Sequence, residues 1–263
     1  MKSATVRALL VRGMLAGVLA GLLSFGLAYL IGEPQVDAAI AVEEAGAAHH
    51  GHGGGGGEPE EELVSRAVQS TAGLSTAVLV YGTALGGITA LALCFALGRV
   101  GAFGTRATAA FVAAGGFLAV AFVPFLKYPA NPPAVGDPET LNQRTAMFFL
   151  MIVLSVLLLI GAVLVGKKLA PRWGNWNATI AAGAAFAVAV GIALAFLPAG
   201  DAIPEHFPAD VLWQFRLASI GVQALLWAAL GLILGELSQR VLEPKPAQAS
   251  RQSAEPAASV PAS

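Results

Sequence analysis

Long apolar runs recur along this 263-residue chain and constrain its fold more than any other feature. A run of about 18 residues or more can cross roughly 30 Å of hydrocarbon as a helix. In lipid every backbone polar group must be paired internally, which a helix achieves and an open loop does not. Only 12% of the residues are charged, whereas soluble domains carry about 25%. The sequence therefore excludes a soluble globular protein and predicts an all-α polytopic membrane protein.

The runs predict six transmembrane helices, arranged as three helical hairpins. The expected spans cover residues 8–31, 67–97, 107–126, 145–165, 179–197 and 215–234. A Gly/His/Glu-rich segment, residues 32–66, is expected to form an outside loop after the first span. Residues 244–263, rich in Pro, Ala and Ser, have too little apolar surface to fold. We therefore expect one transmembrane domain, residues 1–243, followed by a disordered cytoplasmic tail.

The distribution of Lys and Arg predicts the orientation, because basic residues accumulate on the cytoplasmic side. With both termini inside, eleven of the fifteen basic residues are cytoplasmic and only Arg66, Lys127, Arg144 and Arg216 lie outside. The inside set is Lys2, Arg7, Arg12, Arg99, Arg106, Lys167, Lys168, Arg172, Arg240, Lys245 and Arg251. The uncharged stretch 13–31 exceeds the 7–15 residues usual in a secretory signal peptide. We expect a retained first helix and an N-in, C-in topology in a bacterial inner membrane.

Three glycines in the first span, Gly13, Gly17 and Gly21, follow one another at four-residue spacing. That spacing places them on one helix face, where a neighbouring helix can approach closely. The same spacing recurs at Gly82 and Gly86. The pattern predicts close helix packing, either within the chain or in a homo-oligomer.

The three expected outside loops end alike, with a proline, an acid, a leucine and then an arginine before the next span. The arginines are Arg66, Arg144 and Arg216, and the acids include Glu139 and Asp210. One explanation is that the arginines extend to lipid head groups. The other is that they face the interior of the bundle and pair with acids there. The residues leave both explanations open.

The segment after the first span carries three of the four histidines of the chain, His49, His50 and His52. Neutral imidazole is the commonest metal ligand and suits zinc, copper, nickel and cobalt. Glu43 and Glu44 could add oxygen ligands on the same flexible carrier. These five residues predict a metal-capturing loop outside the membrane, and the alternative is a solvated low-complexity linker.

Several chemistries have no motif here. There is no Walker A loop for ATP hydrolysis, and neither a His-Glu-x-x-His sequence nor a Ser/His/Asp set occurs, so we expect no enzyme. No carboxylate falls in the middle of a predicted span, which disfavours a proton-coupled antiporter. A transport subunit or permease with an external energy source fits better, and no nucleic-acid partner is expected.

Three stretches carry a resemblance to a known family. They are His49-His50-Gly51-His52, residues 125–138 (FLKYPANPPAVGDP), and Phe207-Pro208 followed by residues 212–219 (LWQFRLAS). In these stretches the chain resembles the CbtA family, predicted cobalt transporter subunits of bacteria. The resemblance implies cobalt uptake linked to cobalamin synthesis, beside a small single-span CbtB-like partner.

The leading hypothesis is therefore a subunit or permease for divalent cobalt, with nickel as the alternative metal and no tightly bound cofactor. A membrane scaffold or metal sensor, which binds metal outside and recruits a partner without moving the ion, is the alternative. The positive charge of the arginines would repel a bare cation unless Glu139, Asp210 and their neighbours neutralise it.

Overall fold

The computed structural model describes residues 3–50, 64–133, 135–136, 140–200 and 203–243. Helices occupy nearly all of this part of the chain, and no strand occurs in it. The all-α class predicted from the apolar runs is therefore confirmed. In chain order the elements are α1 (Ser3–Leu27), the π-helical turn η1 (Ala28–Gly32), α2 (Glu33–His50), α3 (Arg66–Val68), η2 (Gln69–Gly73), α4 (Leu74–Ala96), α5 (Thr105–Gly116), η3 (Phe117–Phe122), α6 (Val123–Lys127), α7 (Leu141–Phe196) and α8 (Ala209–Leu242).

Helices long and apolar enough to cross a membrane account for most of the described chain. They are Ser3–Gly46, Arg66–Ala96, Thr105–Lys127, Leu141–Phe196 and Ala209–Leu242, five in all among the described residues. The first three each contain one of the π-helical turns, where the helix widens locally without ending. The chain is thus a multi-pass membrane protein, as the apolar runs predict.

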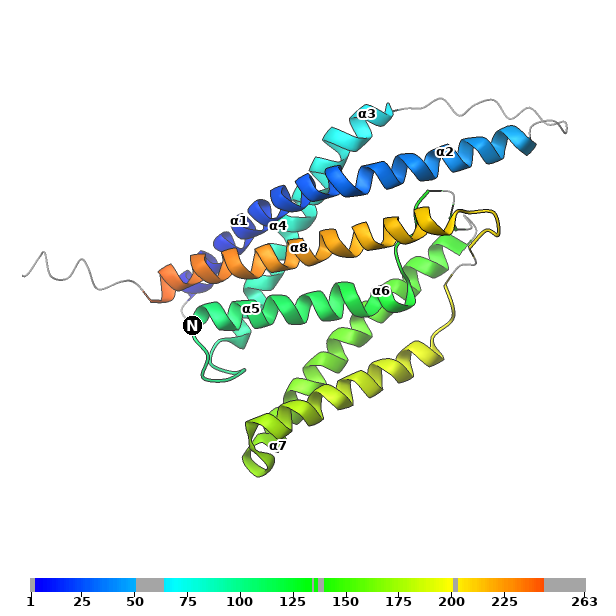
Figure 1. Ribbon diagram of the computed structural model, residues 1–263. Coiled ribbons are helices and arrows are strands. Elements are labelled where there is room, and N and C mark those ends of the chain that lie inside the picture. The colour runs from blue at the N-terminus through cyan, green and yellow to red at the C-terminus, as the bar shows by residue number, and fades with distance from the viewer. Residues whose placement is uncertain (1–2, 51–63, 134, 137–139, 201–202, 244–263) are drawn as a thin grey trace, which may run out of the picture.

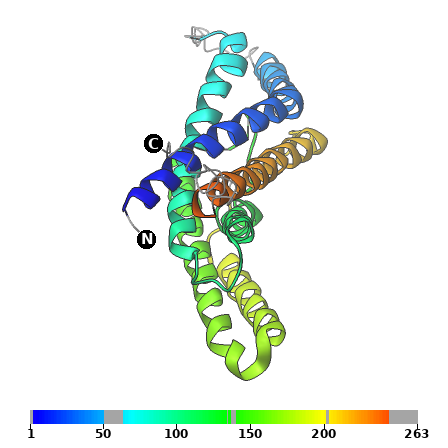
Figure 2. The same ribbon diagram turned by 90° about the vertical axis from the view of Figure 1, so that its left-hand side faces the viewer.

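Helix α7 is a hairpin rather than one straight rod. Its 56 residues would extend about 84 Å as an unbroken helix. Gly174 interrupts it with φ 74° and ψ 160°, a conformation that glycine adopts without steric cost. The chain reverses there, and the two limbs run back alongside each other (Figures 1 and 2). Met151 of the first limb and Val190 of the second share one buried cluster. Each limb contains one of the two spans predicted in this region.

Helix α2 occupies a stretch where a loop was expected. That expectation is wrong for residues 33–50, because their composition favours a helix. Six of its 18 residues are alanine, the residue with the highest helix propensity. Ala39 is fully buried in a cluster with Phe207 and Leu212, so α2 packs against the start of α8. The remainder of the predicted loop up to residue 63, and the tail 244–263, lie outside the described residues.

The centre of the bundle is α8, with α1 and α5 packed along it and α4 packed along α1 (Figure 1). The α7 hairpin contacts the rest of the bundle mainly through η3 and α6. The start of α1 and the end of α8 lie at the same end of the bundle, which we call the termini end (Figure 1). We call the opposite end, which carries α2, the α2 end.

Glycines allow α1 and α4 to approach each other backbone to backbone. A Cβ atom at Gly17 would lie 2.1 Å from the carbonyl oxygen of Gly82, and one at Gly13 would lie 2.4 Å from that of Gly86. No side chain larger than hydrogen fits at such distances. Gly21, one turn further on, faces Val78 of α4, whose carbonyl oxygen would be 3.2 Å away. The structure thus places all three glycines of the α1 face against α4 of the same chain.

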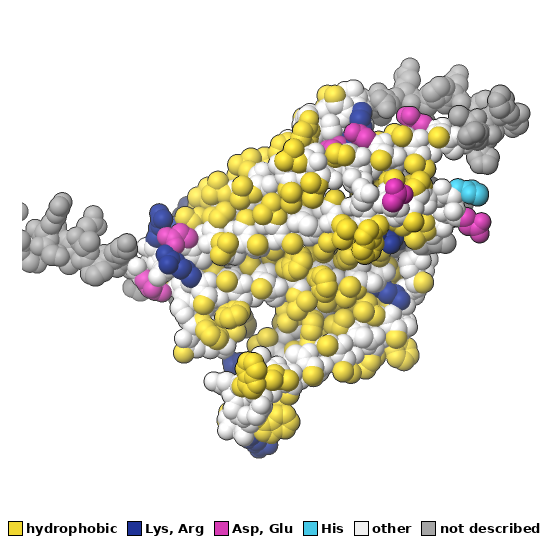
Figure 3. All heavy atoms as spheres, viewed as in Figure 1, with side chains coloured by type: hydrophobic (Ala, Val, Ile, Leu, Met, Phe, Trp, Pro, Cys, Tyr) yellow, Lys and Arg dark blue, Asp and Glu magenta, His cyan; other side chains and the backbone are white. Residues whose placement is uncertain are grey.

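Charged side chains gather at the two ends of the molecule, and apolar side chains cover the helices between them (Figure 3). Large apolar residues such as Leu22, Phe95, Leu157 and Leu232 are exposed on these helices. Exposed apolar surface of this extent is what lipid-facing helices present, because the bilayer core offers no polar partner.

Candidate functional site

A large open cavity lies toward the α2 end of the bundle, between the α1–α2 junction, α4, η3 and α6, the first limb of α7, and α8. Its volume is about 1780 Å³. Its polar and charged lining consists of Glu33, Glu43, Tyr81, Lys127, Tyr128, Asn131, Arg144, Thr145, Arg216, Ser219 and Gln223. Most of the lining is apolar, and an apolar cavity with a few convergent polar groups is a candidate ligand site.

One face of α8 connects the cavity to the core of the bundle. Arg216, Ser219 and Gln223 line the cavity and are spaced three and four residues apart, so they share that face. Two helical turns separate Arg216 from Gln223, which places Gln223 about 10 Å deeper along the axis. There Gln223 lies close enough to Tyr81 of α4 for the two side chains to interact. The polar lining therefore extends well into the apolar part of the bundle.

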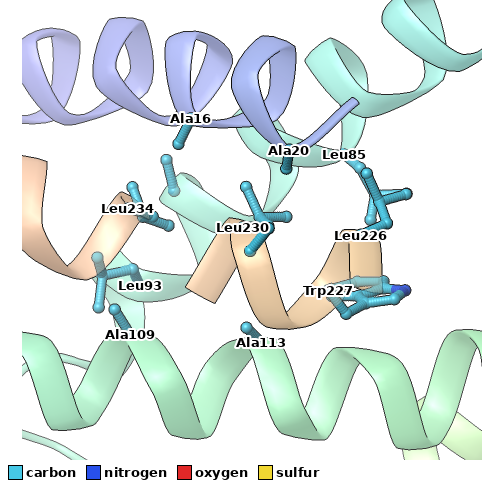
Figure 4. Close-up of a cluster of buried hydrophobic side chains, with 12 residues drawn as sticks. Ala16, Ala20, Leu85, Leu93, Ala109, Ala113, Leu226, Trp227, Leu230 and Leu234 are labelled. Atoms are coloured by element: carbon cyan, nitrogen blue, oxygen red, sulfur yellow. The ribbon is translucent and has the colours of Figure 1, made fainter. Parts of the chain in front are cut away.

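The same face of α8 becomes apolar one turn further on, and it closes the cavity toward the termini end. Trp227, Leu230 and Leu234 are almost fully buried, in a cluster with alanines of α1 and α5 (Figure 4). The packing is tight, since a Cβ atom at Gly116 of α5 would lie 2.2 Å from the Trp227 ring. Packed side chains thus bound the cavity toward the termini end.

Ionic contacts join α5 and α8 beyond that cluster, at the termini end. Glu236 forms ion pairs with Arg106 of α5 and with Arg240 one turn further along α8. Glu243 accepts a hydrogen bond from the Thr105 hydroxyl at 2.9 Å, and this bond is the main reason that the pKa of Glu243 lies below its usual value. These contacts add a polar layer to the closed end.

Two cations of the cavity have neutral partners. Lys127 Nζ donates a hydrogen bond to the carbonyl oxygen of Leu194 at 2.7 Å. Arg216 donates through one terminal nitrogen to the side-chain oxygen of Asn131 at 2.9 Å. Arg216 Nε is buried and has no hydrogen-bond partner among the described residues. Neither side chain forms an ion pair with a described carboxylate at hydrogen-bonding distance.

The three predicted outside arginines have different environments. Arg66 pairs with Glu33, which lines the cavity, and with Asp37 of α2 at 3.0 Å. Arg144 and Arg216 line the cavity themselves. Asp210 is exposed at the start of α8, and Glu139 lies outside the described residues. Arg144 and Arg216 therefore line the cavity, whereas Arg66 pairs with two acids of α2 and is not part of the lining, so both explanations of the arginines stay open.

The predicted metal ligands are not brought together in the described part of the chain. Glu43 and Glu44 are exposed on α2, and Glu43 lines the cavity mouth. The side chains of His49 and His50 are not among those that the structure describes. His52 lies outside the described residues. No group of three metal-ligating side chains occurs among the residues that are described, so metal capture by the five residues stays a prediction.

Sequence reasoning missed several side chains of the cavity, among them Lys127 and Asn131. Lys127 was considered only as one of the outside charges, and Asn131 only as part of a family motif. A lysine at the end of a predicted span normally extends to the interface, so no local signal distinguishes one that bonds to another helix. The partner of Lys127, Leu194, is 67 residues away along the chain, and only the fold brings them together.

Comparison with known proteins identifies the family. The family model described as probable cobalt transporter subunit (CbtA) matches residues 6–239 of this chain. No curated protein and no solved structure shows significant similarity to it. The match extends from the first turns of α1 almost to the end of α8 and so includes every helix that forms the cavity. The chain therefore belongs to the CbtA family of probable cobalt transporter subunits.

Proposed function

We propose that this chain is a subunit that takes up divalent cobalt across the bacterial inner membrane, through the cavity at the α2 end. The observation that carries the proposal is a cavity of about 1780 Å³ toward the α2 end, bounded toward the termini end by packed apolar residues. An outward-facing transporter needs this asymmetry, because alternating access exposes the substrate site to one side at a time. Family membership supplies the substrate.

The proposed topology has six crossings, with both termini in the cytoplasm. Four of the five apolar helices cross once, and the α7 hairpin crosses twice, because its limbs reverse at Gly174. The basic residues support the orientation. In the described chain Arg7, Arg12, Arg99 and Arg106, as well as Arg240, belong to the cytoplasmic set. The α2 end, and with it the opening of the cavity, then faces the periplasm.

Helix α2 supports a role for the histidines in capturing the ion. It packs at the start of α8 through Ala39, and Glu43 lies at the cavity mouth. His49 and His50 follow within two helical turns. We propose that these histidines, with His52, raise the local concentration of cobalt or nickel beside the opening. Members of the family are probable transporter subunits, which fits an assembly of this chain with a small CbtB-like partner. The metal taken up would serve cobalamin synthesis.

The direct test is accumulation of radiolabelled cobalt in energised bacteria that lack their own cobalt uptake. The chain is expressed alone, with a CbtB-like partner, and with His49, His50 and His52 all changed to Ala. A control variant changes the exposed His206 to Ala, which removes one outside histidine away from α2. Western blotting of membrane fractions establishes that each protein is present.

We expect uptake above the empty-vector level, a large decrease in the triple variant and no change with His206→Ala. Uptake that is the same in the triple variant would keep the transport function and reject the capture role. Absence of uptake in every combination, with the protein present in the membrane, would reject transport in favour of a scaffold or sensor.

A further inference from the structure

We infer that the cavity binds a solute bearing carboxylate or phosphate oxygens, and that cobalt occupies it as an anionic complex with such a ligand rather than as a bare dication. The anion site follows from the geometry of the cavity alone. The statement about cobalt also rests on the proposed function.

The charges of the lining favour an anion. Among the described residues of the lining, Lys127 and Arg216 form no ion pair with a described carboxylate, and the acids are Glu33 and Glu43. Glu33 is already paired with Arg66, so its charge is compensated before any ligand arrives. Lys127 and Arg216 then outnumber Glu43 among the described residues, and Coulomb repulsion from this positive balance opposes the approach of a hydrated dication.

Arg216 is arranged as an anion ligand. A guanidinium group has five N–H donors in a planar fork that matches the two oxygens of a carboxylate or phosphate group. In Arg216 one terminal nitrogen bonds to Asn131, and the buried Nε has no partner among the described residues. A buried donor without an acceptor costs free energy. An oxyanion in the cavity would supply the missing acceptor and compensate the charge.

Lys127 supplies a second donor of the same kind. Its ammonium group carries three N–H donors, of which the carbonyl oxygen of Leu194 accepts one. A carbonyl group orients the ammonium group and leaves its net charge intact. Lys127 is at the end of α6, which packs against α7, and Arg216 is in α8, which packs against α1 and α5. A ligand that contacts both side chains would therefore connect these two parts of the bundle.

The lining has few ligands for a bare cobalt ion. Cobalt in proteins takes imidazole, thiolate or carboxylate ligands, yet the described lining contains no His, Cys, Met or Asp. Its other polar groups are amides, hydroxyls and phenols, such as Gln223, Ser219 and Tyr81. These groups hydrogen-bond to the oxygens of an organic ligand more readily than they replace the water of a metal ion.

The test measures binding to the full-length protein in phosphatidylcholine nanodiscs by isothermal titration calorimetry. The probes are sodium citrate, cobalt(II) citrate and cobalt(II) chloride. The variants are Arg216→Gln, Arg216→Lys and Lys127→Gln. The matched control is Arg99→Gln, because Arg99, in the turn after α4, bonds to the carbonyl oxygen of Phe95 at the termini end and does not line the cavity. A second preparation includes phosphatidylglycerol, which distinguishes a lipid head group from a soluble anion.

We expect citrate to bind with or without cobalt. Loss of a charge-assisted hydrogen bond weakens binding by about tenfold to a hundredfold, so Arg216→Gln and Lys127→Gln should each show that loss. Arg216→Lys should recover part of the affinity, and Arg99→Gln should match the wild type. If Arg216→Gln fails to fold in a melting assay, Lys127→Gln decides the question.

Tight binding of cobalt(II) chloride that Arg216→Gln leaves unchanged or strengthens would overturn the inference. Loss of citrate binding on adding phosphatidylglycerol would overturn it too, because the site would then belong to a lipid head group. The uptake assay keeps the two proposals separate. Cobalt uptake without citrate binding would reject the anion site alone, and citrate binding without uptake would reject the transport function alone.

Discussion

Substitution of Gly17 by alanine tests whether the contact between α1 and α4 stabilises the bundle. The new Cβ atom would lie 2.1 Å from the Gly82 carbonyl oxygen and 2.8 Å from its carbonyl carbon. Cβ contacts under 3.0 Å essentially never occur, so the two helices must separate by about 0.9 Å or more. The obstacle is backbone on both sides, and no rotamer change can relieve it.

The expected loss of stability follows from that separation. A radial gap of 0.5–1 Å removes about a quarter to a half of the dispersion energy of a contact. Dispersion is the main attraction between helices in lipid, where the hydrophobic effect does not drive them together. Overpacked substitutions cost about 1–3 kcal/mol, and each kcal/mol lowers the melting temperature by about 2–4 °C in a protein of this size. We expect Gly17→Ala to melt roughly 5 °C below the wild type.

The assay is thermal melting of the purified protein in a mild detergent, followed by size-exclusion chromatography of the folded fraction. Gly26→Ala is the matched control, because Gly26 is on the same helix and has no atom within 4 Å of the added Cβ. That change should leave stability unchanged or raise it slightly, since alanine favours a helix over glycine by about 1 kcal/mol. Equal melting temperatures for the two variants would refute the reasoning.

Two further predictions concern single hydrogen bonds. Ser155→Ala removes the bond from the Ser155 hydroxyl to the carbonyl oxygen of Ala119, which holds the α7 hairpin against η3, and should cost about 1 kcal/mol. Ser24→Ala is its control, because the buried Ser24 hydroxyl has no partner among the described residues. Chemical denaturation measures the stability of both variants, and equal losses would contradict a stabilising role for the Ser155 hydrogen bond. Thr105→Val removes the bond that lowers the pKa of Glu243. Because the pKa of Glu243 is lower in the folded state, its ionised carboxylate stabilises the fold at a pH above the usual pKa of Glu, about 4.3. That contribution disappears as the pH falls through the lowered pKa of the folded state. The wild type should therefore melt above Thr105→Val at neutral pH, and the difference should shrink below about pH 4; a constant difference would exclude Glu243 as its source.

Patterns in the sequence predicted the helical class and the apolar helices well. Each predicted span falls within a helix of the structure to within one residue at its end, including the two that α7 joins. The glycine spacing of α1 predicted a close helix contact, and Gly13 and Gly17 lie against α4. These features are local, because the bilayer requires an apolar helix wherever the chain crosses it.

Prediction was poorer where the membrane imposes no requirement. A loop was expected after residue 32 because the composition changes there, yet alanine propensity and the contact of Ala39 with the start of α8 continue the helix. The arginine pattern named Arg66, Arg144 and Arg216 without their partners. Arg66 pairs with Glu33, which is 33 residues earlier and was not among the expected acids.

The sequence by itself determined that this chain is an all-α membrane protein with several apolar helices. Its motifs also determined the family. Only the tertiary structure decided which polar groups meet, because such contacts depend on how helices distant along the chain pack. The bond between Arg216 and Asn131 spans 85 residues. The cavity depends on such packing as well. Along one face of α8 the side chains are polar where they line the cavity and apolar where α1 and α5 pack against them.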